Sequence, residues 1–175
     1  MLIVNVSRYR SPVRRLLLVV LALVLTTSAA AAPPRKGVLS PGKSLGGLRL
    51  GATPAQVKAA WGSSYGRCRD CARPTWYFTY RRYKPRGAAV QFNRGRVEAI
   101  FTLWAPRGWR TTTGLKIGDD ATRITSLYGT LARTDCPGNY YALTLPTRGG
   151  VNAFYVVNEK VFGFGLVNFT VPVCR

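Results

Sequence analysis

The residues with the clearest chemical potential are two cysteines in the sequence Cys68-Arg69-Asp70-Cys71. Their spacing matches the Cys-x-x-Cys pattern of thiol oxidoreductases, and neighbouring arginines would lower the pKa of a thiolate. However, the motif lacks the strand–helix–strand surroundings typical of such enzymes. A zinc site is disfavoured because Cys136 and Cys174 lack the spacing of a zinc finger. A thiol oxidoreductase at Cys68 and Cys71 therefore remains a minor alternative.

Composition restricts the other catalytic chemistries. The 175 residues include no His, which excludes Ser–His and Cys–His nucleophile pairs and His metal ligands. The carboxylates are expected mostly at a helix cap or in turns, and not facing each other across a cleft as glycoside hydrolysis requires. We therefore expect no enzymatic activity, no catalytic residues, no metal ligands and no cofactor. The six acidic residues are Asp70, Glu98, Asp119, Asp120, Asp135 and Glu159.

The N-terminus predicts export. Residues 1–30 contain four arginines, an apolar run over 16–25 and the small residues Ser28, Ala29 and Ala30, which together are typical of a secretory signal peptide. The apolar run is about half the length that a bilayer core requires. No cysteine lies near the cleavage region, so the expected location is secreted or extracytoplasmic without a lipid anchor. An uncleaved signal anchor is the alternative.

Export also predicts the state of the cysteines, because exported proteins meet oxidising conditions. An even number of cysteines favours two disulfides, and four cysteines allow three connectivities. We favour Cys68 with Cys71 and Cys136 with Cys174. The second bond closes the longer loop and is expected to contribute about 3 to 4 kcal/mol.

The chain contains an internal similarity. Residues 47–53 match residues 114–120 at a constant offset of 67, and the match continues through Gly62 and Gly129. Each copy predicts one short helix. In the first, Thr53 is a suitable N-cap, Pro54 suits the first helical position and Gln56 completes a capping box. In the second, Asp120 is the expected cap, and a glycine ends each helix.

After each helix the pattern changes to that of strands. The β-branched and aromatic runs cover 75–81, 88–92 and 96–104 and, after the second helix, 140–145, 151–157 and 160–169. Turns are expected at 93–95 and at 158–159. Gly163 and Gly165 are expected to allow close packing against an aromatic side chain.

Together these elements predict an α+β fold of two tandem repeats. Each repeat is a short capped helix followed by antiparallel strands, and the sheets join into one curved sheet with the helices on one side. The expected boundaries are a mature N-terminal arm over 31–44, a first repeat over 45–104, a linker over 105–113 and a second repeat over 114–175.

The segment from Gly47 to Gly62 reads Gly-Leu-x-Leu-Gly-x-Thr-x-x-Gln-Val-x-x-x-Trp-Gly. It resembles the tandem-repeat β-lactamase inhibitory proteins and the related small lipoproteins of the outer-membrane assembly machinery. The resemblance extends over most of the mature chain, although the second copy departs from the pattern at the cap and at the Gln. It implies a non-enzymatic protein-binding scaffold with a concave sheet. Contact residues in such scaffolds vary freely, so none is transferred to this chain.

Strand alternation suggests a binding face. It places Trp76 and Phe78 on one face, and Tyr77, Arg81 and Tyr83 on the other, which is the expected solvent face. Gln91, Glu98 and Thr102 continue that polar set on the neighbouring strands. Such an aromatic and Arg-bearing surface has the composition of protein interfaces. The alternative is an ordinary sheet with cross-strand pairs.

A basic run follows the first strand: Arg81, Arg82, Tyr83, Lys84, Pro85 and Arg86. This loop could bind an anionic envelope polymer or lipid headgroups, whereas export argues against nucleic acid. A loop that serves only solubility is the alternative. Residues 33–110 carry 16 basic and 2 acidic side chains, whereas residues 111–175 carry 6 and 4, so any function of the charge belongs to the first half.

The sequence therefore predicts an exported protein-binding or inhibitory module that acts through the exposed sheet face. Its partner is expected to be an exported or cell-surface protein. The alternative is a cell-envelope factor that binds an anionic polymer or lipid headgroup through the basic loops. The candidate binding residues are Tyr77, Arg81, Arg82, Tyr83, Lys84, Arg86 and Gln91, and the oligomeric state is left open.

Overall fold

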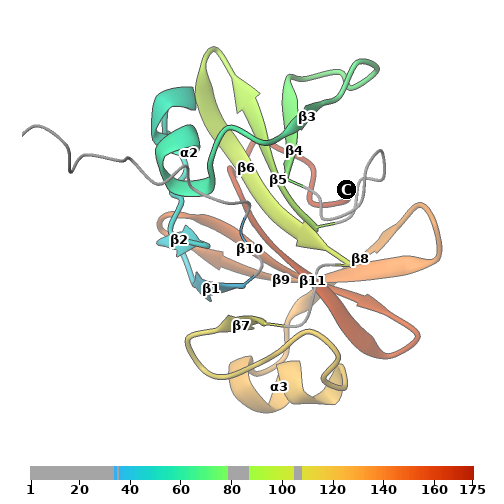
Figure 1. Cartoon of the computed structure of the whole chain (residues 1–175). Helices are drawn as coiled ribbons and strands as arrows, with labels where there is room; N and C mark the ends of the chain where they lie inside the picture. The colour runs from blue at the N-terminus through green and yellow to red at the C-terminus, as the bar shows by residue number, and fades with distance from the viewer. Residues whose placement is uncertain (1–33, 35, 79–86, 105–107) are drawn as a thin grey trace, which may run out of the picture. The chain divides into compact units, whose positions relative to one another are not determined.

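Strands dominate the described part of the chain. The computed structural model describes residues 34, 36–78, 87–104 and 108–175, which contain eleven strands and two short helices (Figure 1). The predicted signal peptide over residues 1–30 lies outside the described residues.

Eight of these strands form one antiparallel sheet in the order β3-β4-β5-β6-β11-β10-β9-β8. Two meanders of consecutive strands meet where β6 pairs with β11, a register that places Phe101 opposite Gly165. Asn158 and Glu159 both have positive φ angles, as a two-residue hairpin turn between β10 and β11 requires. The strands are β3 (Gly66–Arg67), β4 (Thr75–Phe78), β5 (Gly87–Asn93), β6 (Arg96–Leu103), β8 (Ala132–Cys136), β9 (Tyr140–Thr147), β10 (Gly150–Val157) and β11 (Lys160–Val167).

A second, three-stranded sheet joins segments that are distant in sequence. β1 (Gly37–Ser40) pairs antiparallel with β2 (Ser44–Leu45) and parallel with β7 (Trp109–Thr111). The two helices, α2 (Pro54–Trp61) and α3 (Thr122–Tyr128), are 8 and 7 residues long.

The predicted fold class is wrong. The chain is not an α+β protein of two tandem helix-plus-sheet repeats, but a mostly β protein with an eight-stranded antiparallel sheet and a three-stranded sheet. The helices are too short to set the class. In addition, the segments interpreted as arm (31–44) and linker (105–113) contain β1 and β7, which pair with each other. A pairing between segments about 70 positions apart leaves no local pattern in the sequence.

The helix starts differ between the two helices. The Thr53 side chain accepts from the backbone N–H of Gln56, and the Gln56 side chain accepts from that of Thr53, so the predicted capping box is confirmed. The prediction that Asp120 caps the second helix is wrong. The N-cap is Ala121, whose methyl side chain cannot accept a hydrogen bond, and the Asp120 carboxylate pairs with Lys160 at 2.5 Å.

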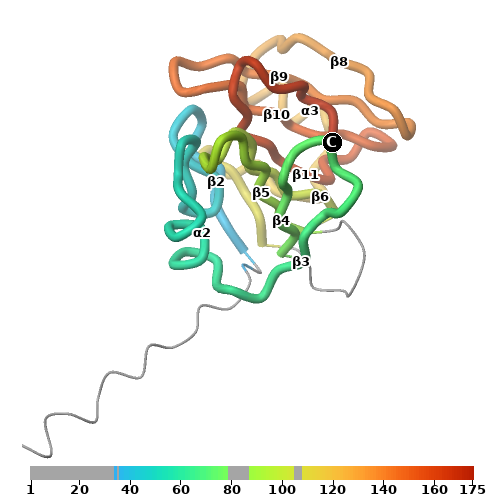
Figure 2. The backbone as a smooth tube through the Cα atoms, turned by 90° about the horizontal axis from the view of Figure 1, so that it is seen from above, coloured from blue at the N-terminus to red at the C-terminus, as the bar shows by residue number. Residues whose placement is uncertain are grey.

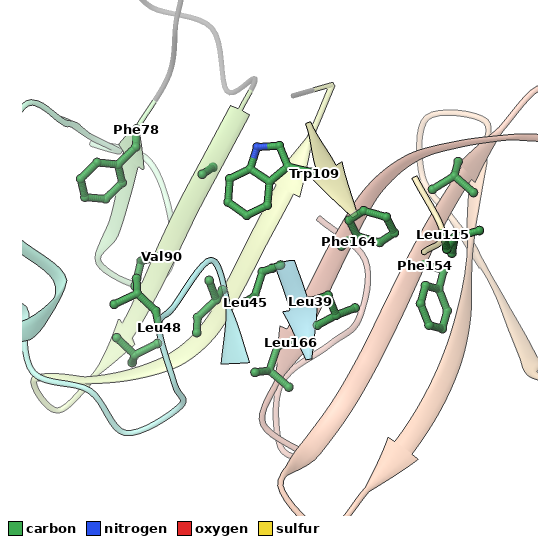
Figure 3. Close-up of a cluster of buried hydrophobic side chains, with 14 of the residues drawn as sticks. Leu39, Leu45, Leu48, Phe78, Val90, Trp109, Leu115, Phe154, Phe164 and Leu166 are labelled. Atoms are coloured by element: carbon green, nitrogen blue, oxygen red, sulfur yellow. The ribbon is translucent and has the colours of Figure 1, made fainter. Parts of the chain in front are cut away.

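One face of the large sheet packs against both helices and the small sheet; we call it the core face. Trp61 of α2 and Trp109 of β7 are fully buried and meet edge to face, 6.2 Å apart. The sheet contributes large side chains from both meanders. Figure 3 shows the small-sheet residues Trp109, Leu39 and Leu45 between Phe78 and Val90 on one side and Phe154 and Phe164 on the other.

Candidate binding site on the second face of the large sheet

The opposite face of the large sheet, which we call the pocket face, combines small residues with aromatic and aliphatic side chains. Ala89, Ala99, Ala142 and Ala153 are buried there together with a few aromatic side chains. Gly165 also faces this side. Its close packing against an aromatic side chain was predicted from the sequence and is confirmed. A Cβ atom on Gly165 would lie 2.6 Å from the hydroxyl oxygen of Tyr155. Small side chains leave a shallow surface on which another segment can lie.

The 168–175 segment occupies much of this surface. Val171 is buried in the same cluster, and Val173 packs against it. The buried hydroxyl of Tyr155 donates to the backbone carbonyl of Val173 at 2.8 Å. Figure 2 shows the end of the segment (C) beside the stretch that precedes β4. The expectation that this sheet face is simply open to solvent is therefore wrong.

Two disulfides hold the segments that border the pocket face. Cys136 of β8 is bonded to Cys174, and Cys68 is bonded to Cys71, so the predicted connectivity is confirmed. No cysteine of the chain is free. Next to Cys174, the backbone N–H of Arg175 donates to the hydroxyl oxygen of Tyr140 at 2.7 Å, which fixes the end of the segment on the sheet.

A pocket of about 630 Å³ lies between the two disulfide-bonded segments. Its volume is within the range of small-ligand sites. Strands β4, β5 and β6 form its floor, and residues from both bordering segments form its walls. The lining residues are Cys71, Ala72, Arg73, Thr75, Tyr77, Gln91, Phe101, Leu103, Trp104 and Arg175.

The pocket contains two guanidinium groups in different states. Arg73 forms an ion pair with Glu98, whose side chain is almost completely buried. Arg175 donates to the side-chain oxygen of Gln91 at 2.8 Å and lies 5.3 Å from the ring centroid of Phe101. Among the described residues, no Asp or Glu carboxylate lies within 4.0 Å of Arg175. The pocket therefore has one neutralised and one unneutralised positive charge.

Aromatic side chains form much of the apolar lining of the pocket. Tyr77 meets Phe101 edge to face, with 6.5 Å between ring centroids. Burial raises the pKa of the Tyr77 hydroxyl, and the nearby charge of Arg175 partly opposes this shift. The hydroxyl is thus protonated near neutral pH and can donate a hydrogen bond. Trp104 packs against Phe162 and is 54% exposed at the rim, with a φ angle of 51°.

Two of the predicted binding residues, Tyr77 and Gln91, lie together in the pocket. The other five, Arg81, Arg82, Tyr83, Lys84 and Arg86, lie outside the described residues. The expectation that Glu98 and Thr102 belong to a solvent face is wrong. Glu98 is 5% exposed and Thr102 is fully buried.

Sequence reasoning missed Arg73, Phe101, Trp104 and Arg175. For Arg175 a signal existed, because the predicted Cys136–Cys174 bond brings the residue after Cys174 next to the sheet. Phe101 shares the strand alternation of Tyr77 across β5. Arg73 lies before β4, where no periodicity indicates its direction. Trp104 belonged to the predicted strand run 96–104, but β6 ends at Leu103 and Trp104 has a positive φ, so strand alternation does not apply to it.

The described ranges contain neither a metal-holding cluster of side chains nor a helix that could cross a membrane. Within 36–78, 87–104 and 108–175, no three Cys, Asp or Glu side chains lie close enough together to hold a metal ion. None of the described helices is long and apolar enough to span a bilayer.

Comparisons with known proteins give no family. No family model matches the chain, and no curated protein matches it. Among solved structures, it is similar to an extracellular protein containing an SCP domain from Bacillus anthracis str. Ames, at 11% identity and a TM-score of 0.40. The similarity covers 69% of this chain and 44% of that chain. At this TM-score the likeness carries no argument about fold or function.

Proposed function

We propose that the protein is an exported, non-enzymatic module that binds a partner protein through the pocket face. The observation that carries the proposal is the pocket between the two disulfide-bonded segments, which combines Tyr77, Phe101 and Trp104 with the unneutralised Arg175. Aromatic residues and Arg are the residue types enriched at the energetic centres of protein interfaces.

The composition of the pocket supports binding over catalysis. Its titratable lining residues are arginines, which stay protonated, and Tyr77, whose raised pKa keeps it protonated as well. General acid–base chemistry near neutral pH requires a group that exchanges protons in that range. Cys71, the remaining reactive type in the lining, is held in a disulfide.

Two features support export. Both disulfides fit a protein that matures under oxidising conditions. The basic and apolar pattern of residues 1–30 fits a cleaved signal peptide without a lipoprotein cysteine. The proposed partner is accordingly an exported or cell-surface protein.

The test is capture of partners from exported proteins by the mature protein at about 0.5 M salt, which screens simple charge attraction. Three proteins are compared: the unsubstituted protein, Trp104→Ala and Phe169→Ala. Phe169 is a matched control because it is 61% exposed but does not line the pocket. We expect the first and third to retain the same partner and Trp104→Ala to lose it.

Two results would contradict the proposal. Equal capture by Trp104→Ala would remove the pocket from the interface. Loss of all capture at high salt would favour the alternative, an envelope factor that binds an anionic polymer or lipid headgroup, because such attraction weakens steeply as salt rises. Arrays of teichoic acid or anionic lipid would then be the ligands to examine.

A further inference from the structure

We infer that the pocket takes one aromatic side chain of the partner protein, flanked in the partner's sequence by an acidic residue. This inference rests on the proposed function and specifies the chemistry of the contact. It depends on three properties of the pocket: its aromatic walls, its distribution of charge and the way its walls are fixed.

The aromatic part follows from the shape of the apolar surface. Phe101 and Leu103 form adjacent parts of the floor, Tyr77 stands beside Phe101, and Trp104 is half exposed at the rim. Rings pack favourably against one another edge to face or offset, with centroids about 4.5 to 7 Å apart. Because Phe101, Tyr77 and Trp104 all line the pocket, an inserted ring finds aromatic partners for such packing, which a short aliphatic group would use less fully.

The acidic part follows from the charges. Arg73 is matched by Glu98, which leaves the guanidinium of Arg175 as the unneutralised charge of the lining. The side chain of Arg175 is already oriented, because Gln91 and the carbonyl oxygen of Pro172 accept two of its N–H groups. An oriented guanidinium forms strong, charge-assisted hydrogen bonds to a carboxylate. The Tyr77 hydroxyl adds a second donor.

The same arrangement disfavours a basic anchor. No carboxylate lines the pocket, and Glu98 is buried behind Arg73. A Lys or Arg side chain of a partner would therefore meet the unneutralised charge of Arg175 and no available negative charge. We therefore expect the proposed site to bind acidic anchors much more tightly than basic anchors.

Both walls are fixed before binding. Cys71 in one wall is bonded to Cys68, and Arg175 in the other follows Cys174, which is bonded to β8. Walls that are already ordered lose little conformational entropy on binding. A short peptide is therefore expected to reproduce the contact of the whole partner at measurable affinity.

The experiment titrates isotope-labelled mature protein with acetyl-Asp-Phe-Asp-amide and follows nuclear magnetic resonance shifts. The indole N–H signal of Trp104, assigned through Trp104→Phe, is the reporter. Matched peptides are acetyl-Asp-Ala-Asp-amide, which lacks the ring, and acetyl-Lys-Phe-Lys-amide, which reverses the charge. We expect saturable shifts of the Trp104 signal with the first peptide alone.

The protein variants test the role of Arg175. Arg175→Ala is expected to weaken binding of acetyl-Asp-Phe-Asp-amide at least about tenfold, because a hydrogen bond to a charged group is lost. Arg148→Ala, which removes an exposed arginine that does not line the pocket, should leave the affinity unchanged. Arg175→Gln serves as a second variant, since it removes the charge but keeps a polar, hydrogen-bonding side chain in case the alanine variant loosens the 168–175 segment.

The inference is overturned if the three peptides bind alike, if none binds, or if Arg175→Gln binds as tightly as the unsubstituted protein. These results differ from failure of the proposed function. If partner capture depends on Trp104 but the protein does not distinguish the three peptides, the interface at the pocket is retained. The acidic aromatic anchor is then ruled out.

Discussion

The two faces of the large sheet are closed in different ways. The core face is covered by two helices and a small sheet and filled by large side chains such as Trp61 and Trp109. The pocket face mixes alanines with aromatic and aliphatic side chains and is covered in part by one segment, residues 168–175, held by a disulfide. The first arrangement leaves the sheet fully packed, whereas the second leaves a pocket.

This difference indicates a division of labour. The core face has the dense packing on which stability depends. On the pocket face, the half-exposed ring of Trp104 and the unneutralised guanidinium of Arg175 both line the pocket that the covering segment leaves open. Among the variants below, Trp109→Ala tests the packing of the core face. The disulfide, Gly165 and Tyr155 variants test how the covering segment is held on the pocket face.

Trp109→Ala is expected to have the largest effect. Trp109 is fully buried against Trp61, and its ring also lies where a Cβ on Gly37 or Gly46 would clash. Removing it should lower the free energy of unfolding by about 3 to 5 kcal/mol, measured by urea denaturation. The matched control is Trp104→Ala, for which a loss below about 1 kcal/mol is expected. Similar losses for both variants would contradict the contrast between the faces.

Removing the disulfide that holds the covering segment should have the next effect. Cys136→Ser combined with Cys174→Ser opens a closure with a sequence separation of 38, against 3 for Cys68 and Cys71. Loop-closure entropy predicts a loss of about 4 kcal/mol for the first pair and about 2 kcal/mol for the second. Denaturation of the two double variants under non-reducing conditions measures the difference. An equal loss would show that the segment is held mainly by other contacts.

Gly165→Ala is expected to cost about 1 to 3 kcal/mol through overpacking. Its new Cβ would lie 2.6 Å from the hydroxyl oxygen of Tyr155, which would also disturb the hydrogen bond to Val173. Combining it with Tyr155→Phe should cost less than the sum of the single changes. Gly66→Ala is the control, because nothing lies within 4 Å of its new Cβ. Additive free energies in the double-mutant cycle would refute the proposed contact.

The smallest effect concerns alkaline pH. Burial raises the pKa of Tyr155 to about 12, with Arg175 opposing the shift. Since this value lies above the ordinary value near 10, the folded state binds the proton more tightly and stability decreases as pH rises between them. From pH 9 to pH 11 the group should account for a loss of about 1 kcal/mol. A Tyr155→Phe variant should lack this part of the pH dependence, and an unchanged slope would contradict it.

Local features of the fold were predictable from the sequence. The Thr53 capping box is local, and the strand runs have side-chain patterns that hairpin turns separate. The number of cysteines allowed three disulfide connectivities, and the one that the sequence analysis favoured is the one observed. The fold class was wrong because the helices are short and because β1 and β7 pair across a long separation, which leaves no local pattern. The predicted cap at Asp120 was wrong because the second helix begins after Ala121, and the Asp120 carboxylate pairs with Lys160, 40 positions away.

The pocket could be predicted only in part. Tyr77 and Gln91 follow from strand alternation and lie in the lining. Arg73 precedes β4, Trp104 follows β6 and Arg175 follows Cys174, so these three meet only through the tertiary fold. Alternation identified the right face but gave no sign that residues 168–175 cover much of it.

The most direct test of the central claim compares the partner affinity of two tryptophan variants. Trp104→Ala should weaken binding of the captured partner at least about thirtyfold, as expected for a residue at the centre of an interface, with little change in stability. Trp109→Phe, measured under conditions where it is folded, should lower stability and leave the dissociation constant unchanged. If Trp109→Phe weakens binding as much as Trp104→Ala, or if Trp104→Ala binds normally, the division between a structural face and a binding face is contradicted.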